Sequence, residues 1–118
     1  MKSIYIGILV GALGLLLVVA TKSKADPVPA GTIFDQIVDV RTADEFREDH
    51  VHGAVNIGVL ENSFSEKIAK LDREKIYGVY CRSGGRSAKA KSIMTKLGFK
   101  NVINLGSLTQ AKQNSKGK

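Results

Sequence analysis

Short apolar runs alternate with amphipathic stretches along most of the chain, and this alternation restricts the folds that the sequence can adopt. Four runs are rich in branched and aromatic side chains, which favours strands or extended segments. They lie at residues 37–40, 51–57, 76–80 and 102–105. After the third run, Ala90, Ile93, Met94 and Leu97 recur at the spacing of one helical face. Strands that alternate with helices imply a parallel sheet with helices on its faces. The sequence therefore predicts a small α/β domain at residues 33–108.

Local signals also place the ends of the helices. Thr42 and Ser63 are each followed three residues later by a glutamate, which is the pattern of a capping box. The helix after Thr42 is expected to place Phe46 in the core. The helix of the amphipathic stretch is expected to begin at Ser87 and to end at Gly98.

The first 25 residues carry the features of an export signal. Lys2 precedes an apolar stretch at residues 4–20, and small residues suited to cleavage lie at 23–25 and at 18–20. We therefore predict a signal peptide at residues 1–25 and a periplasmic or secreted protein. The alternative is an uncleaved membrane anchor that faces the periplasm or exterior, because the run is only slightly shorter than the ~18 residues of a spanning helix.

Two further segments flank the predicted domain. Residues 26–32 contain Pro27, Pro29 and Gly31 and are typical of a linker. Residues 109–118 are polar and basic, and we expect them to form a frayed tail.

The net charge argues against a nucleic-acid binder. It is +7 for the whole chain but falls by three, to +4, without Lys2, Lys22 and Lys24 of the export segment. A nucleic-acid interface usually combines a dense basic patch with stacking aromatic side chains, and this sequence has no tryptophan. The predicted partners are small molecules, with a membrane only if the N-terminal segment stays uncleaved, and we expect a monomer.

Cys81 is the only cysteine of the chain, and its setting favours a reactive thiolate over an inert core thiol. The apolar run at 76–80 leads into it, and glycines in the sequence CRSGGRS at 81–87 allow tight curvature. Backbone N–H groups of such a loop can turn towards the sulfur, and the next helix directs its positive end at the same place. Both effects lower a cysteine pKa. Cys81 also ends a predicted parallel strand, where ligands bind in such sheets.

Four motifs in a fixed order carry a specific resemblance. DVR at 39–41, EF at 45–46, HGAVNI at 52–57 and CRSGGRS at 81–87 are similar to the ordered motifs of single-domain rhodaneses. The similarity covers about residues 33–108. The export segment and the short chain resemble the small periplasmic rhodaneses of the phage-shock protein E type. Residues 105–108 depart from the family pattern, because they lack a second glycine and a tryptophan. That difference bears on the pocket wall and the docking of the C-terminus.

The resemblance implies a sulfurtransferase without a cofactor. Cys81 would attack the outer sulfur of an anionic donor such as thiosulfate, release sulfite and hold the transferred sulfur as a persulfide. An acceptor such as cyanide or a thiol would then remove that sulfur. The residues that would bind the donor are Arg82, Ser83, Gly84, Gly85 and Arg86. The arginines would neutralise the donor and the loop amides would stabilise the charged sulfur, with a larger contribution expected from Arg86 than from Arg82.

The remaining polar residues are assigned supporting roles. We expect Asp39 and Arg41 to support the fold and the loop. His50 and His52 are expected to lie at a turn and to bind no metal, because no acidic or cysteine cluster accompanies them. Ser87 is expected to begin a helix, and its hydroxyl could reach the site at Cys81.

Other functions remain as alternatives. A cysteine phosphatase is disfavoured, because it needs an arginine after five intervening residues, where this chain has Ser87; Arg86 follows after only four. A non-enzymatic module could carry a persulfide or an anion for a partner protein. A membrane-tethered partner of a redox system is the third possibility.

Overall fold

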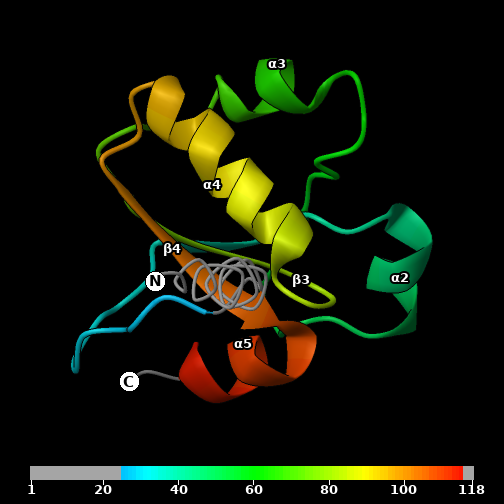
Figure 1. The fold of residues 1–118 in the computed structure, drawn as a ribbon, viewed down its shortest axis with the longest axis vertical. Helices are drawn as coiled ribbons and strands as arrows, with labels where there is room; N and C mark the ends of the chain where they lie inside the picture. The colour runs from blue at the N-terminus through cyan, green and yellow to red at the C-terminus, as the bar shows by residue number, and fades with distance from the viewer. Residues whose placement is uncertain (1–24, 116–118) are drawn as a thin grey trace, which may run out of the picture.

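Strands and helices alternate along residues 25–115, the part of the chain that the computed structural model describes (Figure 1). In chain order they are β1 (Gln36–Asp39), α2 (Ala43–Glu48), β2 (Val55–Asn56), α3 (Phe64–Ile68), β3 (Ile76–Cys81), α4 (Gly85–Lys96), β4 (Asn101–Ser107) and α5 (Leu108–Asn114).

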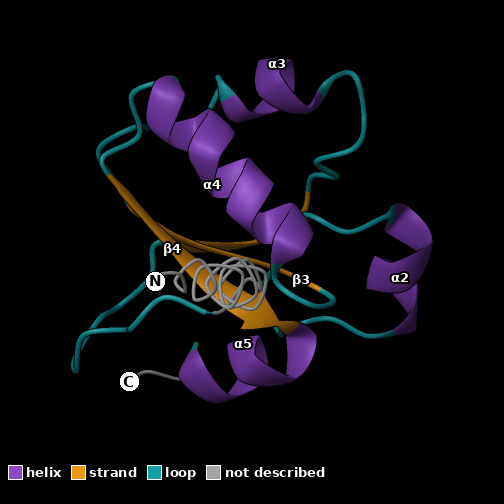
Figure 2. Cartoon of the chain, in the orientation of Figure 1, coloured by secondary structure: helices purple, strands orange, loops and turns teal. Residues whose placement is uncertain are grey.

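The strands form one sheet in the order β2-β1-β3-β4, and every neighbouring pair is parallel. Figure 2 shows the strands of this sheet in orange, with α4 on one side and α5 on the other. Val38 of β1 lies opposite Val79 of β3 at the centre of the sheet. Parallel neighbours need crossover connections, which the helices supply. Because all strands run the same way, their carboxyl ends meet at one edge. The predicted α/β fold, a parallel sheet flanked by helices, is confirmed.

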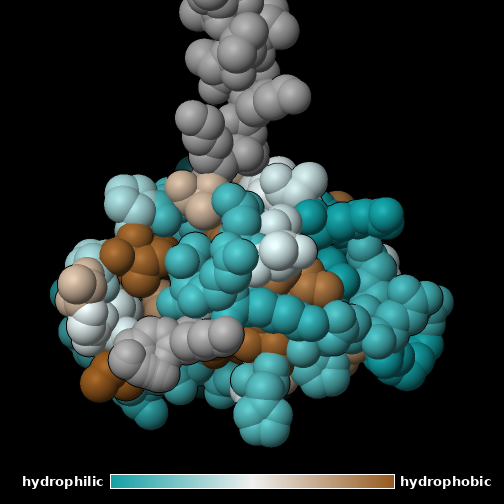
Figure 3. All heavy atoms as spheres, turned by 90° about the horizontal axis from the view of Figure 1, so that it is seen from below, coloured by the Kyte–Doolittle hydropathy of each residue, from teal (hydrophilic) through white to brown (hydrophobic). Residues whose placement is uncertain are grey.

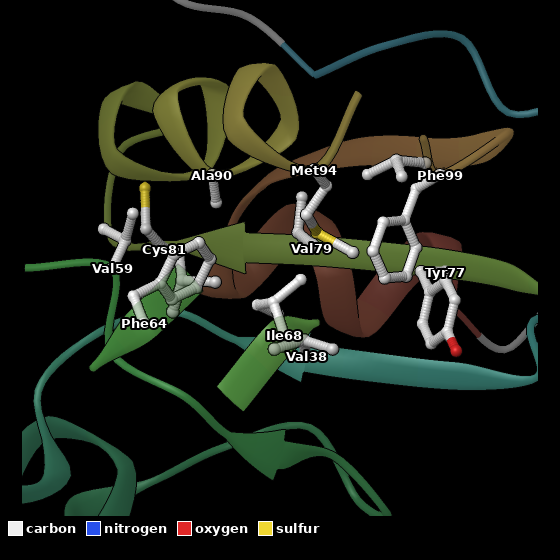
Figure 4. Packing of buried hydrophobic residues seen from close by; sticks show 12 residues of the cluster. Val38, Val59, Phe64, Ile68, Tyr77, Val79, Cys81, Ala90, Met94 and Phe99 are labelled. Carbon is white, nitrogen blue, oxygen red and sulfur yellow. The ribbon is translucent and has the colours of Figure 1, made fainter. Parts of the chain in front are cut away.

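Helices α3 and α4 cover one face of this sheet and enclose the larger core cluster (Figure 4). Its fully buried members include Val38, Val79, Ile68, Ala90 and Met94. Burial of each large apolar side chain contributes roughly 1.5–3 kcal/mol relative to exposure. The predicted apolar stripe of α4 therefore faces the sheet, and Ile93 and Leu97 pack against the edge of the same cluster.

Helix α5 lies on the opposite face of the sheet and covers most of the predicted frayed tail, so that prediction is wrong for residues 109–114. Ser107 and Gln110 form a capping box at its start, and Ala111 is fully buried against Leu105 and Tyr80. Burial of Ala111 therefore orders a segment whose polar and basic composition is typical of a mobile tail. Figure 3 views the molecule from this side and shows a mostly hydrophilic surface with separate hydrophobic patches.

The segment predicted as a linker is also tied to the domain. The Asp26 N–H donates to the Asn104 carbonyl at 2.7 Å, and an Asp26 carboxylate oxygen accepts from the Asn104 N–H at 2.8 Å. The same oxygen pairs with Lys91 at 2.6 Å. The chain from Asp26 onwards is therefore joined to β4 and α4.

The predictions for the helix ends and for Phe46 are confirmed in part. The capping box at Thr42 forms in full, but Ser63 makes no side-chain capping bond. Phe46 is not a core residue, because α2 has no buried residue and Phe46 instead stacks on His50. Helix α4 begins at Gly85, two residues before Ser87, since Gly84 adopts a positive φ of 100° that turns the chain into the helix.

Within the described part of the chain, no helix is long and apolar enough to cross a membrane. The predicted signal peptide or anchor lies outside the described residues, apart from its last residue, Ala25.

Candidate active site

Cys81 is the last residue of β3, at the sheet edge where the carboxyl ends of the strands meet. The loop of residues 82–84 follows, and α4 begins at Gly85. Figure 4 shows the Cys81 sulfur directed towards the first turn of α4. The fold therefore places the sulfur at the positive end of a twelve-residue helix.

Hydrogen-bond donors surround the buried sulfur. The Gly84 N–H donates to Cys81 Sγ at 2.9 Å, the Ser87 N–H donates at 3.4 Å, and the Ser87 hydroxyl lies 3.4 Å away. Burial of Cys81 raises the pKa of its thiol, but the hydrogen bonds from Ser87 and from the loop amides together outweigh burial, so the pKa is lowered. This is the direction that the sequence predicted for a reactive cysteine.

Ser87 is held by a residue that the sequence analysis missed. Its hydroxyl donates to Asn104 Oδ1 at 2.7 Å, and both side chains are buried. The only local signal for Asn104 is a polar residue inside an apolar strand. Its contact with Ser87 joins residues 17 positions apart. Sequence periodicity alone does not reveal such a pairing.

Arg86 is bound by Glu45 of α2. Two hydrogen bonds of 2.8 and 3.0 Å join the guanidinium to the two carboxylate oxygens. The bonds from Arg86 hold the pKa of the Glu45 carboxyl at about 2. The same pair raises the pKa of Arg86. The sequence indicated Glu45 only as a capping residue, and it fills that role as well by accepting from the Thr42 N–H.

Arg82 lies on the exposed side of the loop, as do Ser83 and Gly85, whereas Gly84 is buried. In the part of the chain that the structure describes, no carboxylate forms a salt bridge with Arg82. The shallow pocket beside Arg82 is lined by Arg41, Glu45, Glu48, Ser107, Leu108 and Thr109. The two loop arginines thus differ, because one is engaged by a carboxylate and the other is open to solvent.

Asp39 and Arg41 support the structure, as the sequence predicted. Arg41 Nε and Nη2 donate to the Asp39 carboxylate at 2.9 and 2.7 Å, and the pair is buried. Tyr80 O–H donates to the same carboxylate at 2.7 Å, and Arg41 also bonds the Asp49 carbonyl at 2.6 Å. These bonds join the end of β1 to β3 and to the end of α2.

The two histidines stand apart from the sulfur site. His50 Nδ1 bonds the Phe46 carbonyl at 2.7 Å, and the two rings stack with centroids 3.7 Å apart. His52 is exposed in the adjoining turn. Across residues 25–115 no cluster of three metal-ligating side chains occurs.

A buried thiol with a lowered pKa, in an amide-lined loop at the carboxyl edge of a parallel sheet, is an arrangement suited to a nucleophilic thiolate. The rhodanese-like domain family matches residues 22–113. The chain therefore belongs to the rhodanese family and is an enzyme of the sulfurtransferase class.

Several proteins with similar sequences have functional names, and similar structures have been solved. Thiosulfate sulfurtransferase PspE of Escherichia coli (strain K12) is 35% identical over 71 residues, which cover 60% of this chain and 68% of that protein. YrkF of Bacillus subtilis (strain 168), whose name describes a sulfur carrier, is 39% identical over 71 residues, covering 58% of this chain and 36% of that protein. A rhodanese solved with anions from Escherichia coli superposes with a TM-score of 0.55 at 31% identity, over 64% of this chain and 88% of that one.

Proposed function

We propose that the protein is a thiosulfate sulfurtransferase that carries sulfur as a persulfide on Cys81. The observation that carries this proposal is the set of donors directed at Cys81 Sγ. The Gly84 and Ser87 N–H groups stabilise negative charge on the sulfur without a mobile counter-ion. The thiosulfate activity named for PspE supports the choice of donor.

The proposed reaction has two displacement steps. In the first step the Cys81 thiolate bonds to the outer sulfur of thiosulfate, the sulfur–sulfur bond of the donor breaks, and its electron pair leaves with sulfite. In the second step cyanide carbon or an acceptor thiolate attacks the outer sulfur of the persulfide. The electron pair of the Sγ–sulfur bond then returns to Cys81, which regenerates the thiolate.

Donor binding is assigned to the loop of Arg82, Ser83, Gly84, Gly85 and Arg86. The solvent-facing guanidinium of Arg82 can meet an incoming dianion directly. Arg86 reaches the site with two of its nitrogens already bonded to Glu45. The contacts therefore favour Arg82 as the first partner of the donor. Arg86 adds a charge that Glu45 partly compensates.

The experiment is intact-mass analysis after incubation with thiosulfate, followed by an assay of thiocyanate formation from cyanide. Gain of one sulfur atom and catalytic thiocyanate production are expected for the native protein. Neither is expected for Cys81→Ser, which lacks the only thiol. Wild-type turnover in Cys81→Ser would refute the mechanism.

A sulfur carrier is the second candidate, and the similarity to YrkF favours it. A carrier would receive its sulfur from one partner protein and pass it to another, so thiosulfate alone would not load it. The same two assays separate these functions, because a carrier shows neither the mass gain with thiosulfate nor catalytic thiocyanate formation.

We also infer that the protein is exported, from the charged start and the apolar stretch at residues 4–20. Mass analysis of protein from the native host is expected to find a mature N-terminus near Thr21 or Asp26. Recovery of the full-length chain only from membranes would support an anchor instead.

A further inference from the structure

Asn104 is a buried amide whose polar atoms are all engaged beside the reactive sulfur. Its side chain sits in β4, and the residue is only 3% exposed. Oδ1 accepts from the Ser87 hydroxyl at 2.7 Å and from the Gly106 N–H at 2.9 Å, while Nδ2 donates to the Gly84 carbonyl at 3.3 Å. Reversing the amide would set two N–H groups against each other at Gly106. Asn104 therefore presents an acceptor oxygen to Ser87.

The Ser87 hydroxyl has one proton and three acceptors around it. Asn104 Oδ1 lies at 2.7 Å, the Gly84 carbonyl at 3.1 Å and Cys81 Sγ at 3.4 Å. A single O–H cannot serve Asn104 and the sulfur at the same time. The short bond directs it at Asn104 and leaves an oxygen lone pair for a Cys81 thiol proton. A thiolate accepts hydrogen bonds only, so beside the two backbone N–H donors the hydroxyl can add a third by turning from Asn104 to the sulfur.

We infer that Asn104 is a positioning residue that competes with the Cys81 sulfur for the Ser87 proton. The proton lies on the Asn104 side while Sγ is neutral and turns to Sγ when negative charge forms there. Without a sulfur donor, the neutral and charged forms of Sγ are the Cys81 thiol and thiolate. In catalysis it rests on the proposed function: Sγ is neutral within the persulfide and becomes charged as the leaving group when the acceptor attacks.

The charged groups near this pair are accounted for by other contacts. The positive charge of Arg86, in α4, acts electrostatically on the Cys81 sulfur, and Glu45 of α2 forms a salt bridge with Arg86. Behind Asn104, Asp26 pairs with Lys91 and binds the backbone of β4. Substitution of the Asn104 side chain removes none of these charges. A change in the ionisation of Cys81 then comes through the Ser87 hydroxyl or through the Gly84 loop that Nδ2 binds, and the sign of the change separates the two routes.

The test measures the Cys81 pKa from the pH dependence of its alkylation rate, which reports one site because the chain has one cysteine. Asn104→Leu removes the competing acceptor at similar volume. It should lower the pKa by about one, a roughly tenfold change in the ionisation constant. Ser87→Ala should raise the pKa. In the Ser87→Ala background, Asn104→Leu should change nothing further, because Asn104 acts through the hydroxyl.

The sign of the change separates positioning from packing. If Asn104 only held the loop together, its loss would loosen the amides around the sulfur and raise the pKa towards that of a free cysteine. Asn104→Asp keeps an oxygen at the same position and should not lower the pKa. An unchanged or raised pKa in folded Asn104→Leu, judged by circular dichroism, overturns the inference.

A second measurement uses the native protein, in case Asn104→Leu fails to fold. The Gly106 N–H shares Asn104 Oδ1 with Ser87, so its amide resonance should shift as Cys81 ionises. That shift should disappear in Ser87→Ala. A resonance that does not respond in the native protein overturns the inference. Both measurements omit a sulfur donor, so failure of sulfur transfer would refute the proposed function without altering them.

Discussion

The contact between Glu45 and Arg86 predicts a specific effect of removing one negative charge beside the site. Glu45→Gln keeps the side-chain oxygen that accepts from the Thr42 N–H, and glutamine serves at this position of a capping box. The substitution therefore retains the helix cap and removes the ionic part of the contact with Arg86. We expect lower stability together with tighter thiosulfate binding.

The size of the stability loss follows from the Glu45 pKa. The carboxyl pKa falls from its ordinary 4.5 to about 2, which corresponds to a ceiling of about 3 kcal/mol. The two side chains are 22% and 25% exposed, so solvent screens the pair. We therefore expect a loss of about 1–2 kcal/mol in the free energy of unfolding at neutral pH.

The pH dependence carries a definite sign. Because the Glu45 pKa is depressed in the folded protein, the stabilisation is complete above 4.5 and is lost as the pH falls towards about 2. Urea unfolding of the native protein and Glu45→Gln should differ at neutral pH and converge across this window. Glu48→Gln, on the same helix and exposed, is the matched control. A gap that persists at low pH, or is no larger than in Glu48→Gln, would refute the reasoning.

The same substitution tests the site. Release of Arg86 from Glu45 leaves an uncompensated guanidinium near Cys81, so the KM for thiosulfate should fall by about 3- to 10-fold. An unchanged KM would show that Arg86 does not contribute to binding of the donor.

Two further outcomes follow from the site and the core. Alanine at Arg82 or at Arg86 should lower kcat/KM for thiosulfate by about 10- to 100-fold with partial rescue by lysine, since a charged hydrogen bond contributes about 1.5–3 kcal/mol; a loss that tracks thermal unfolding would make the arginine structural. Gly78→Ala should destabilise by about 1–3 kcal/mol in urea unfolding, because a Cβ there would lie 2.6 Å from Leu105 Cδ1. Gly85→Ala, which meets nothing within 4 Å, is the control, and equal stability of the two variants would contradict the packing argument.

The features that could be predicted from sequence are those with local causes. The parallel sheet follows from the alternation of strands and helices, and the loop at Cys81 follows from consecutive residues with glycines. The Thr42 cap succeeded because its donor and acceptor lie three residues apart. Phe46 failed because a helical pattern says nothing about whether a helix lies against the sheet, and α2 does not bury a residue.

The features that could not be predicted depend on contacts between distant residues. Glu45 and Arg86 are 41 positions apart, and Ser87 and Asn104 are 17 apart. Helix α5 is stabilised by burial of Ala111, although the composition of its segment resembles a mobile tail. In each case the partner, rather than the residue itself, decides the role.

The crossover between β3 and β4 also determines when the sulfur becomes reactive. The two strands are parallel, so a crossover must join them, and this crossover consists of the loop after Cys81 and α4. Before the loop and α4 form, Cys81 is an ordinary thiol, of which only a few per cent is thiolate at about neutral pH. A chain that crosses a membrane unfolded would therefore carry a sulfur that oxidants and alkylating agents attack slowly. Nucleophilicity at Cys81 therefore depends on the folded loop and the first turn of α4, and its appearance over time, followed by alkylation, would report when they form.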